Sequence, residues 1–324
     1  MKIKDRKANM TEVIECSILR ITEGTAKNGT YLNITVCDGE KNITAKMFKQ
    51  ALEGFKYEEG DAVFITLNAS VYNDSLSYVV KEITASSSDP SQFLMSAPLN
   101  NEEMFNYLCK MGSNCGVYAH LIKSILEDNK ERFIVWGAAK SVHHNIRSGL
   151  IYHTYRMVKT AIHIANLYNK EPSMLKVEPP VPDRNINTGL LVAGAILHDI
   201  GKLWELNTSN IGNSEYTPMG VLMGHLFIGA ELIGKYAEKE NMKEEDKILL
   251  QHMILSHHGK YEYQAVALPA IPEAQLLHYI DQIDATMYQF EVTRNALGPG
   301  MLSDRVFGLG ERVYCPNVES FEVH

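Results

Sequence analysis

The sequence predicts a two-domain α+β protein, in which a small N-terminal β-barrel is followed by an all-α helical bundle. Residues 11–84 contain short runs of β-branched and alternating residues that are separated by turn signals. Polar, Pro-containing breaks follow at 85–91 and 97–100. Beyond them, apolar residues such as Met104 and Tyr107 recur at helical spacing. Two different periodicities on either side of one break indicate two domains.

The N-terminal part reads as five strands with one short helical interruption at 49–55. We expect the strands at 13–21, 31–37, 42–48, 61–69 and 76–83. Five short strands in so short a segment suggest a closed barrel, and the pattern resembles an OB-fold, whose strands and loops commonly hold single-stranded nucleic acid. We place this barrel at 1–89, a linker at 90–99 and the helical domain at 100–324.

An OB-type binding face would carry exposed aromatic and basic side chains. The candidates for contacting substrate are Tyr31, Lys46, Phe48 and Tyr78. Nucleobases stack on aromatic rings whatever their identity, which suits sequence-tolerant binding. The alternative is that Phe48 and some of the tyrosines belong to the barrel core.

The second part starts with an N-cap and an acidic first turn at 100–103. We expect helices at 117–126, 133–139, 150–168, 188–199, 220–239, 244–257 and 273–296. The four prolines within 170–187 indicate a loop. The tail after residue 298 is weakly patterned, and we assign it no structure.

The composition is that of an ordinary soluble protein, with 45% apolar and 22% charged residues among 324. Five widely spaced cysteines without a C-x-x-C pair favour reduced thiols and a cytoplasmic protein. We see no signal peptide and no apolar stretch long enough for a membrane span. The net charge of −8 argues against wholesale coating of nucleic acid.

The twelve histidines are confined to the chain from His120 onward. A subset lies near the ends of separate predicted helices, together with two aspartates: His153, His198, Asp199, His225, His257, His258 and Asp281. The neighbouring His198 and Asp199 could by themselves be a solvated helix end. Each helix of a bundle can contribute one or two inward-facing ligands, however, which is a standard way to build a metal site.

The number and type of these side chains limit the metal. Six or seven nitrogen and oxygen ligands are too many for one tetrahedral ion but suit two octahedral-leaning ions that share a carboxylate. No thiol is among them, so structural zinc is disfavoured. We expect two divalent ions, Mn²⁺ first, with Co²⁺, Fe²⁺, Ni²⁺ and Mg²⁺ as alternatives.

The ordered set His, His-Asp, His, His-His, Asp resembles the HD-domain metal-dependent phosphohydrolase superfamily. Together with the OB-like domain, the local strings are similar to the YhaM-type 3′-to-5′ exoribonuclease family; they lie at 138–144, 149–154, 194–202, 220–225, 254–259 and 277–285. The sequence departs from the family pattern at Tyr152, at 145–149 and in the long Pro-rich loop before residue 188. These departures leave the metal-binding set intact and bear on substrate preference.

The resemblance implies a role for each matched residue. The ligands of a first metal would be His153, His198, Asp199 and Asp281. The ligands of a second metal would be His225, His257 and His258, with Asp199 bridging the two ions. Lys202 would face the phosphate and act with Asp199 in catalysis. His143 and His144 would either contact the phosphate or be structural, and Asp284 would be structural.

The function that the resemblance implies is a 3′-to-5′ exoribonuclease that hydrolyses single-stranded RNA, and potentially single-stranded DNA, to nucleoside monophosphates through a two-metal-activated water. The alternative is an HD phosphohydrolase that acts on nucleotides or cyclic dinucleotides, with the barrel as an assembly module. A third interpretation is a nucleic-acid-binding protein with a purely structural metal. We also expect a homo-oligomer.

Overall fold

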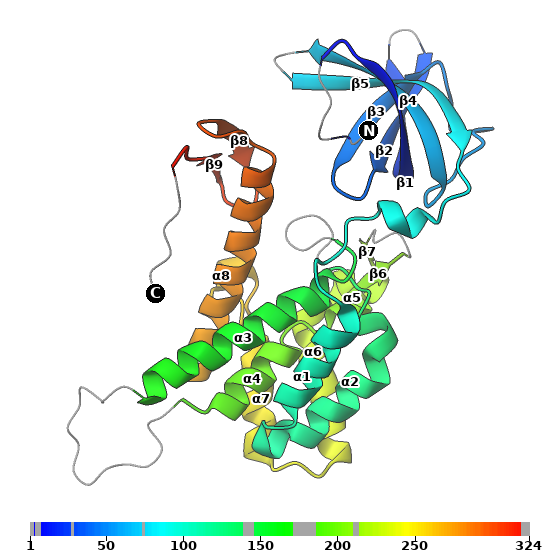
Figure 1. Cartoon of the computed structure of the whole chain (residues 1–324). Coiled ribbons are helices and arrows are strands. Elements are labelled where there is room, and N and C mark those ends of the chain that lie inside the picture. The colour runs from blue at the N-terminus through cyan, green and yellow to red at the C-terminus, as the bar shows by residue number, and fades with distance from the viewer. Residues whose placement is uncertain are drawn as a thin grey trace. The chain divides into compact units, whose positions relative to one another are not determined.

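Five strands near the N-terminus, most of them paired antiparallel, close into a barrel in the order β1-β2-β3-β5-β4 (Figure 1). The strands are β1 (Thr11–Ala26), β2 (Gly29–Cys37), β3 (Asn42–Phe48), β4 (Ala62–Tyr72) and β5 (Ser75–Ala85). All pairs are antiparallel except β3 with β5, which are parallel. This five-stranded barrel has the OB-fold architecture, as the sequence predicts.

The computed structural model describes Ile3 and residues 8–26, 29–72, 75–138, 146–170, 186–209 and 214–318. It divides into two compact units, one of Met1–Pro98 and Thr208–Asn213, the other of Leu99–Asn207 and Ser214–His324. Each unit is described by itself below.

The barrel core follows from the alternation of side chains along the strands. Ile14, Cys16 and Ile18 of β1 are completely buried or nearly so, and Leu32 and Ile34 of β2 face the same interior. Successive strand side chains point to opposite faces, so every second residue enters the core. The predicted strands are confirmed: β3 has the predicted bounds, and the other four differ from them by one to five residues at their ends.

The short helix expected at 49–55 is wrong, because these residues form turns. Lys49 and Gly54 have φ values of 60° and 78°, which a right-handed helix does not accept. A 3-10 helix, η2 (Pro90–Phe93), lies within the expected linker and is capped by the side chain of Asp89.

The second unit contains eight α-helices among its described residues, and four short elements lie between them. The helices are α1 (Asn101–Gly112), α2 (Ala119–Phe133), α3 (Gly149–Lys170), α4 (Thr188–Leu197), α5 (Lys202–Glu205), α6 (Pro218–Lys239), α7 (Glu244–Ser256) and α8 (Pro272–Asn295). The short elements are the 3-10 helices η3 (Gly116–Tyr118) and η4 (Tyr261–Tyr263) and the two-stranded β6 (Leu206–Thr208) and β7 (Ser214–Tyr216).

Helix α4 is the core of this unit. All of its residues from Leu190 to Leu197 are buried, and it packs against α1, α2, α3, α7 and α8. A helix that is apolar all round must be surrounded on all sides. The end of α4 is therefore enclosed by other helices, and it is there that His198 and Asp199 follow.

Two expectations for this unit need correction. The separate helix expected at 133–139 is wrong: α2 extends to Phe133, and residues 134–138 are not helical, since the β-branched Ile134 and Val135 precede Gly137. The tail contains a hairpin, β8 (Leu302–Val306) with β9 (Glu311–Tyr314), where the sequence suggests no structure. Among the described helices, none is long and apolar enough to cross a membrane.

Candidate metal centre

Seven side chains that the sequence singles out converge inside the helical unit. His153 lies on α3, and His198 with Asp199 directly follows α4. His225 lies on α6, the pair His257 and His258 directly follows α7, and Asp281 lies on α8. These residues are far apart in the sequence. The packing of the helices around α4 brings them together.

The carboxylate of Asp199 lies at the middle of this cluster, and its two oxygens face different partners. Oδ2 is 3.1 Å from Nε2 of His198 and 3.9 Å from Nε2 of His153. Oδ1 is 3.4 Å from Nε2 of His225 and 3.9 Å from Nε2 of His257. One carboxylate therefore has a set of imidazoles on each side.

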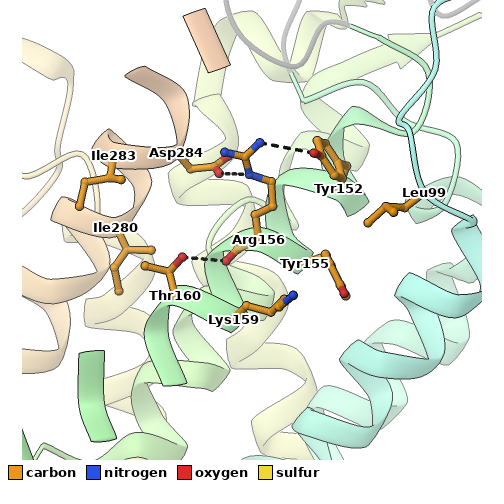
Figure 2. A pocket seen from close by; sticks show the side chains of 9 residues that line it. All are labelled: Leu99, Tyr152, Tyr155, Arg156, Lys159, Thr160, Ile280, Ile283 and Asp284. Carbon is orange, nitrogen blue, oxygen red and sulfur yellow. Dashed lines mark hydrogen bonds and ion pairs between the residues drawn. The ribbon is translucent and has the colours of Figure 1, made fainter. Parts of the chain in front are cut away.

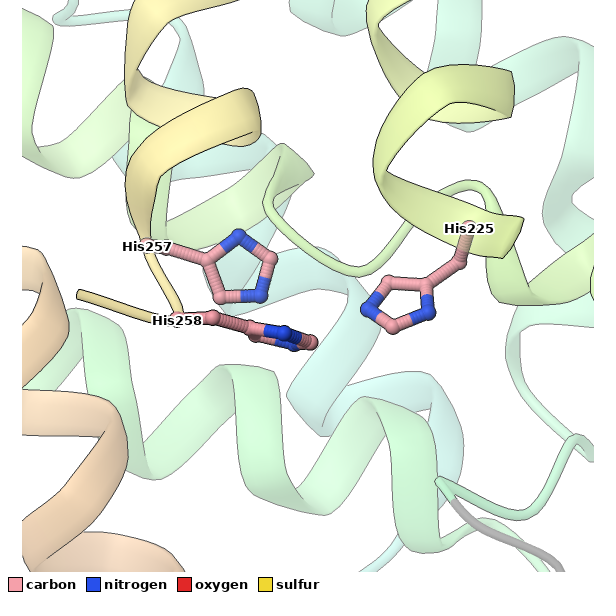
Figure 3. Close-up of side chains that lie close together, drawn as sticks. All are labelled: His225, His257 and His258. Atoms are coloured by element: carbon pink, nitrogen blue, oxygen red, sulfur yellow. The ribbon is translucent and has the colours of Figure 1, made fainter. Parts of the chain in front are cut away.

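Two groups of side chains have ligand atoms that lie within 4.8 Å of one another and could each hold a metal ion. The first is His153, His198 and Asp199, and the second is His225, His257 and His258. Oδ1 of Asp281 is 3.3 Å from Nε2 of His153, which places this carboxylate beside the first group. Figure 3 shows the three rings of the second group turned toward one another, one from α6 and two from the end of α7.

Each of the five histidines has its other ring nitrogen anchored to an oxygen. The Nδ1 partners are Asp284 Oδ2 for His153 (2.8 Å), Ala195 O for His198 (3.0 Å), Glu205 Oε1 for His225 (2.9 Å), Ile254 O for His257 (2.8 Å) and Tyr263 O for His258 (2.6 Å). An acceptor at Nδ1 favours the tautomer with the proton there, which leaves Nε2 with a lone pair. In this tautomer Nε2 is the ring nitrogen that can bind a cation, and Nε2 of His153, His198, His225 and His257 faces Asp199.

Two buried atoms of the cluster have no hydrogen-bond partner among the described residues: Oδ1 of Asp199 and Nε2 of His225. Buried polar atoms are normally satisfied, because an unpaired one costs free energy. A divalent cation between them would satisfy both. The donor set of imidazole nitrogens and carboxylate oxygens, without thiol, fits such an ion.

The pKa values at the centre show how strongly the groups interact. Burial lowers the pKa of His153, but its hydrogen bonds to Asp281 and Asp284 outweigh burial and raise that pKa to about 9. Burial, together with neighbouring histidines, lowers the pKa of His257 and of His258. Carboxylates that attract a proton to an imidazole attract a cation equally, and a cation displaces the proton when it binds.

Lys202 contributes a buried positive charge. Its Nζ lies 2.7 Å from Oδ2 of Asp199. Burial lowers the pKa of Lys202, but the charge of Asp199 outweighs burial and raises it, so the ammonium is charged at neutral pH. Burial alone would raise the pKa of Asp199. The positive charge of Lys202 and the contact with His198 outweigh burial and hold the pKa of Asp199 well below its usual range.

Three further side chains position the ligands and are not predicted as such from the sequence. Glu205 accepts hydrogen bonds from the backbone N and from Nδ1 of His225 (3.0 and 2.9 Å). Asp284 accepts from His153, and His278 Nδ1 donates to the carbonyl of His257 (2.9 Å).

A sequence signal exists for two of the three. His278 and Asp284 lie three residues before and after Asp281, which puts them on one face of the same helix. Nothing local connects Glu205 with His225, which is twenty residues away. The structural role expected for Asp284 agrees with its position behind His153.

The centre opens to a pocket of about 160 Å³ that is lined by charged and polar groups, among them Asp199, Lys202, His258 and Asp281. A second pocket, of about 390 Å³, lies between α3 and α8. In Figure 2, Arg156 reaches from α3 to the carboxylate of Asp284 and to the hydroxyl of Tyr152. Arg156 Nε is 2.6 Å from Asp284 Oδ1, so it holds the carboxylate that in turn holds His153.

The predicted substrate contacts of the barrel have different environments. Phe48 is 53% exposed, its ring centroid is 5.9 Å from that of Tyr31, and Lys46 Nζ lies 5.2 Å from the Tyr31 ring. Tyr78 must be corrected, because it is 9% exposed and belongs to the barrel core. Its position on β5 turns it inward, so its ring is not accessible for stacking on a base. His143 and His144 lie outside the described residues.

Comparison with known proteins agrees with this geometry. The family model described as HD domain matches residues 150–286, a range that contains all seven ligand candidates and Lys202. Among solved structures, the barrel region is similar to the second OB-fold domain of replication protein A from Methanococcus maripaludis. That match has 17% identity and a TM-score of 0.23, and it covers 28% of this chain and 96% of that one. Residues 150–286 of the helical unit therefore match the HD-domain family.

Proposed function

We propose that the protein is a metal-dependent 3′-to-5′ exoribonuclease that hydrolyses single-stranded RNA to nucleoside monophosphates. The observation that carries this proposal is the position of Asp199, whose two carboxylate oxygens face two separate histidine groups beside a buried lysine. A site with ligands on both sides of one carboxylate suits a pair of ions, which is typical of phosphodiester hydrolysis.

The residues divide between two ions as follows. His153, His198, Asp199 and Asp281 would hold the first, and His225, His257 and His258 the second, with Asp199 shared. Divalent cations bound there would supply the Lewis acidity that polarises the phosphodiester and makes water nucleophilic at neutral pH.

Lys202 would stabilise the negative charge on the phosphate. An ammonium has three N–H donors, and the contact with Asp199 uses one of them. Because Lys202 is only 8% exposed and its charge is fixed by Asp199, it is a preorganised cation. Hydrolysis adds water across the bond from phosphorus to the 3′ oxygen of the preceding nucleotide. This step leaves a 3′ hydroxyl on the strand and releases a nucleoside monophosphate.

The barrel would retain the strand between cleavage events. Tyr31 and Phe48 are register partners on β2 and β3, and Lys46 lies over the ring of Tyr31. Two neighbouring aromatic rings beside a lysine ammonium form a surface on which bases can stack. Such stacking does not depend on the identity of the base. This surface favours a polymeric substrate over a free nucleotide or cyclic dinucleotide.

The direct test is digestion of 5′-labelled single-stranded RNA with the purified protein and Mn²⁺, with single-stranded DNA and the other divalent metals in parallel. We expect a ladder of products that shorten from the 3′ end. Asp199→Asn should abolish the ladder, whereas His163→Ala should not, because His163 is exposed on α3 and its ring contacts the carbonyl of Lys159 on the same helix. RNA that remains intact with every metal would refute the proposal.

The barrel is tested with the double variant Tyr31→Ala, Phe48→Ala. Loss of stacking should raise the KM for RNA on the order of 10-fold, at about 1–3 kcal/mol per base, and leave turnover of a mononucleotide ester unchanged. Efficient turnover of nucleotides or cyclic dinucleotides without degradation of RNA would favour the alternative phosphohydrolase.

A further inference from the structure

A pocket of about 480 Å³ lies directly beside the second histidine group. His225 and His258 form its inner side. The start of α6, with Val221, Leu222 and Met223, forms one wall, and Gln264 with Val266 forms another. All of these residues belong to the helical unit.

This pocket is lined by apolar side chains that remain in contact with solvent. Val221 is 71% exposed, Leu222 84% and Val266 57%. Single exposed apolar residues are ordinary, but several around one hollow beside a catalytic centre mark a binding surface.

Both walls are built by the same backbone features that orient the metal ligands. Gly224 has φ 68° and ψ 156°, which breaks α6 and lets the backbone N of His225 reach Glu205. The residues directly before this break, from Gly220 to Met223, then form the first wall. Gln264 has φ 68°, an uncommon conformation for a residue other than glycine. The turn that ends there directs the carbonyl of Tyr263 onto Nδ1 of His258.

The smaller pocket on the other side of His258 has the opposite character. It contains Lys202 and the carboxylates of Asp199 and Asp281, and both pockets share His258. A ligand that reaches across His258 would therefore place a charged group at Lys202 and an uncharged, flat group among the apolar side chains. A nucleotide has this chemistry.

We propose that the apolar pocket binds the nucleobase of the 3′-terminal nucleotide whose phosphodiester is hydrolysed, an assignment that rests on the proposed function. The base packs against Val221, Met223 and Val266, a contact that every base can make. Gln264 and Tyr216 are the lining residues with an uncharged amide or hydroxyl group. Packing without dense polar contacts predicts turnover of all four bases at similar rates.

The test compares two RNA strands that differ only at the 3′-terminal residue, one with a base and one with an abasic ribose. Wild-type protein should show kcat/KM on the order of 10-fold higher for the strand with the base, which is the range of one stacking contact. In the variant Val221→Ser, Val266→Ser, this ratio should fall toward one, because the strand with the base loses the packing that the abasic strand never had. Val266→Trp, which adds stacking surface, should raise the ratio.

The matched control is Val292→Ser, since Val292 is 44% exposed on α8 and does not line the pocket. Its ratio should equal that of the wild type. An unchanged ratio in the double variant would overturn the assignment of this pocket to the base, but not the exoribonuclease function. An equal loss of activity on both strands, together with altered sedimentation, would also overturn it and would indicate an interface between protein copies. If the wild type degrades neither strand, the exoribonuclease function fails and the pocket assignment with it.

Discussion

At the residue scale, the centre depends on groups that hold its ligands in place. Five imidazoles are each anchored at Nδ1, three by backbone carbonyls near helix ends and two by carboxylates. The carbonyl acceptors come with the helix ends themselves. The two carboxylates, Glu205 and Asp284, are side chains and can therefore be tested one at a time.

Replacing Asp284 by Asn should lower metal affinity at the first group 10- to 100-fold, the usual effect of losing an outer partner of a ligand histidine. The neutral amide accepts a weaker hydrogen bond from His153 and no longer forms an ion pair with Arg156. The measurement is titration of the metal-depleted protein with Mn²⁺.

The matched control is Glu291→Gln, because Glu291 also lies on α8 and approaches Arg156, at 3.8 Å, whereas Asp284 binds both Arg156 and His153. Its Mn²⁺ affinity should equal that of the wild type. An equal loss of Mn²⁺ affinity in both variants would show that the ion pairs of Arg156, and not the hydrogen bond from His153 to Asp284, determine the affinity for the metal.

At the element scale, the crossing of α5 with α6 places Lys202 and His225 at the same centre. The two elements approach so closely that a Cβ on Gly201 would clash with the backbone carbonyl of His225 and lie 2.8 Å from the backbone N of Gly229. Gly201 has ordinary helical angles, φ −60° and ψ −22°. Glycine is therefore required here for space and not for conformation.

Gly201→Ala should destabilise the protein by about 1–3 kcal/mol, the usual cost of overpacking. It should also reduce hydrolysis, because separating the two elements moves His225 relative to Asp199. Denaturant unfolding and RNA digestion measure the two effects.

Gly234→Ala on α6 provides the comparison. Its Cβ would meet only the flexible end of Gln251, at 3.0 Å, and alanine favours a helix, so stability should be unchanged or higher by up to about 1 kcal/mol. A Gly201→Ala protein as stable and active as this control would contradict the close crossing.

At the scale of the whole molecule, a bound metal should stabilise the helical fold. The ligands come from α3, α6, α8 and the ends of α4 and α7, so the site exists only when these elements are packed together. A ligand that binds only the folded state stabilises it by about 2.7 kcal/mol at 100 times its Kd.

We therefore expect Mn²⁺ at this excess to raise the Tm of the helical unit by roughly 5–10 °C over the same protein in EDTA, at about 2–4 °C per kcal/mol for a domain of this size. Calorimetry with and without Mn²⁺ measures the shift. Asp199→Asn should lose most of it, and His163→Ala should retain it. Identical Tm values for the wild type in Mn²⁺ and EDTA would contradict a metal site in this cluster.

The strand positions, most helices and the ordered set of histidines and aspartates could be predicted from the sequence, because each depends on local signals. Alternation determines the strands, and caps and glycines determine where helices end. The helices expected at 49–55 and at 133–139 are wrong in the sequence prediction, since one positive φ or one β-branched pair outweighs a weak helical pattern.

The sequence by itself determined which residues could bind a metal, because imidazole and carboxylate side chains recur on separate predicted helices in one ordered set. Only the tertiary structure decided that Asp199 faces two groups, that Glu205 holds His225, that Tyr78 is buried and that an apolar pocket adjoins His258. Each of these depends on distances between residues far apart in the chain. The packing around α4 sets such distances, and no local pattern encodes them.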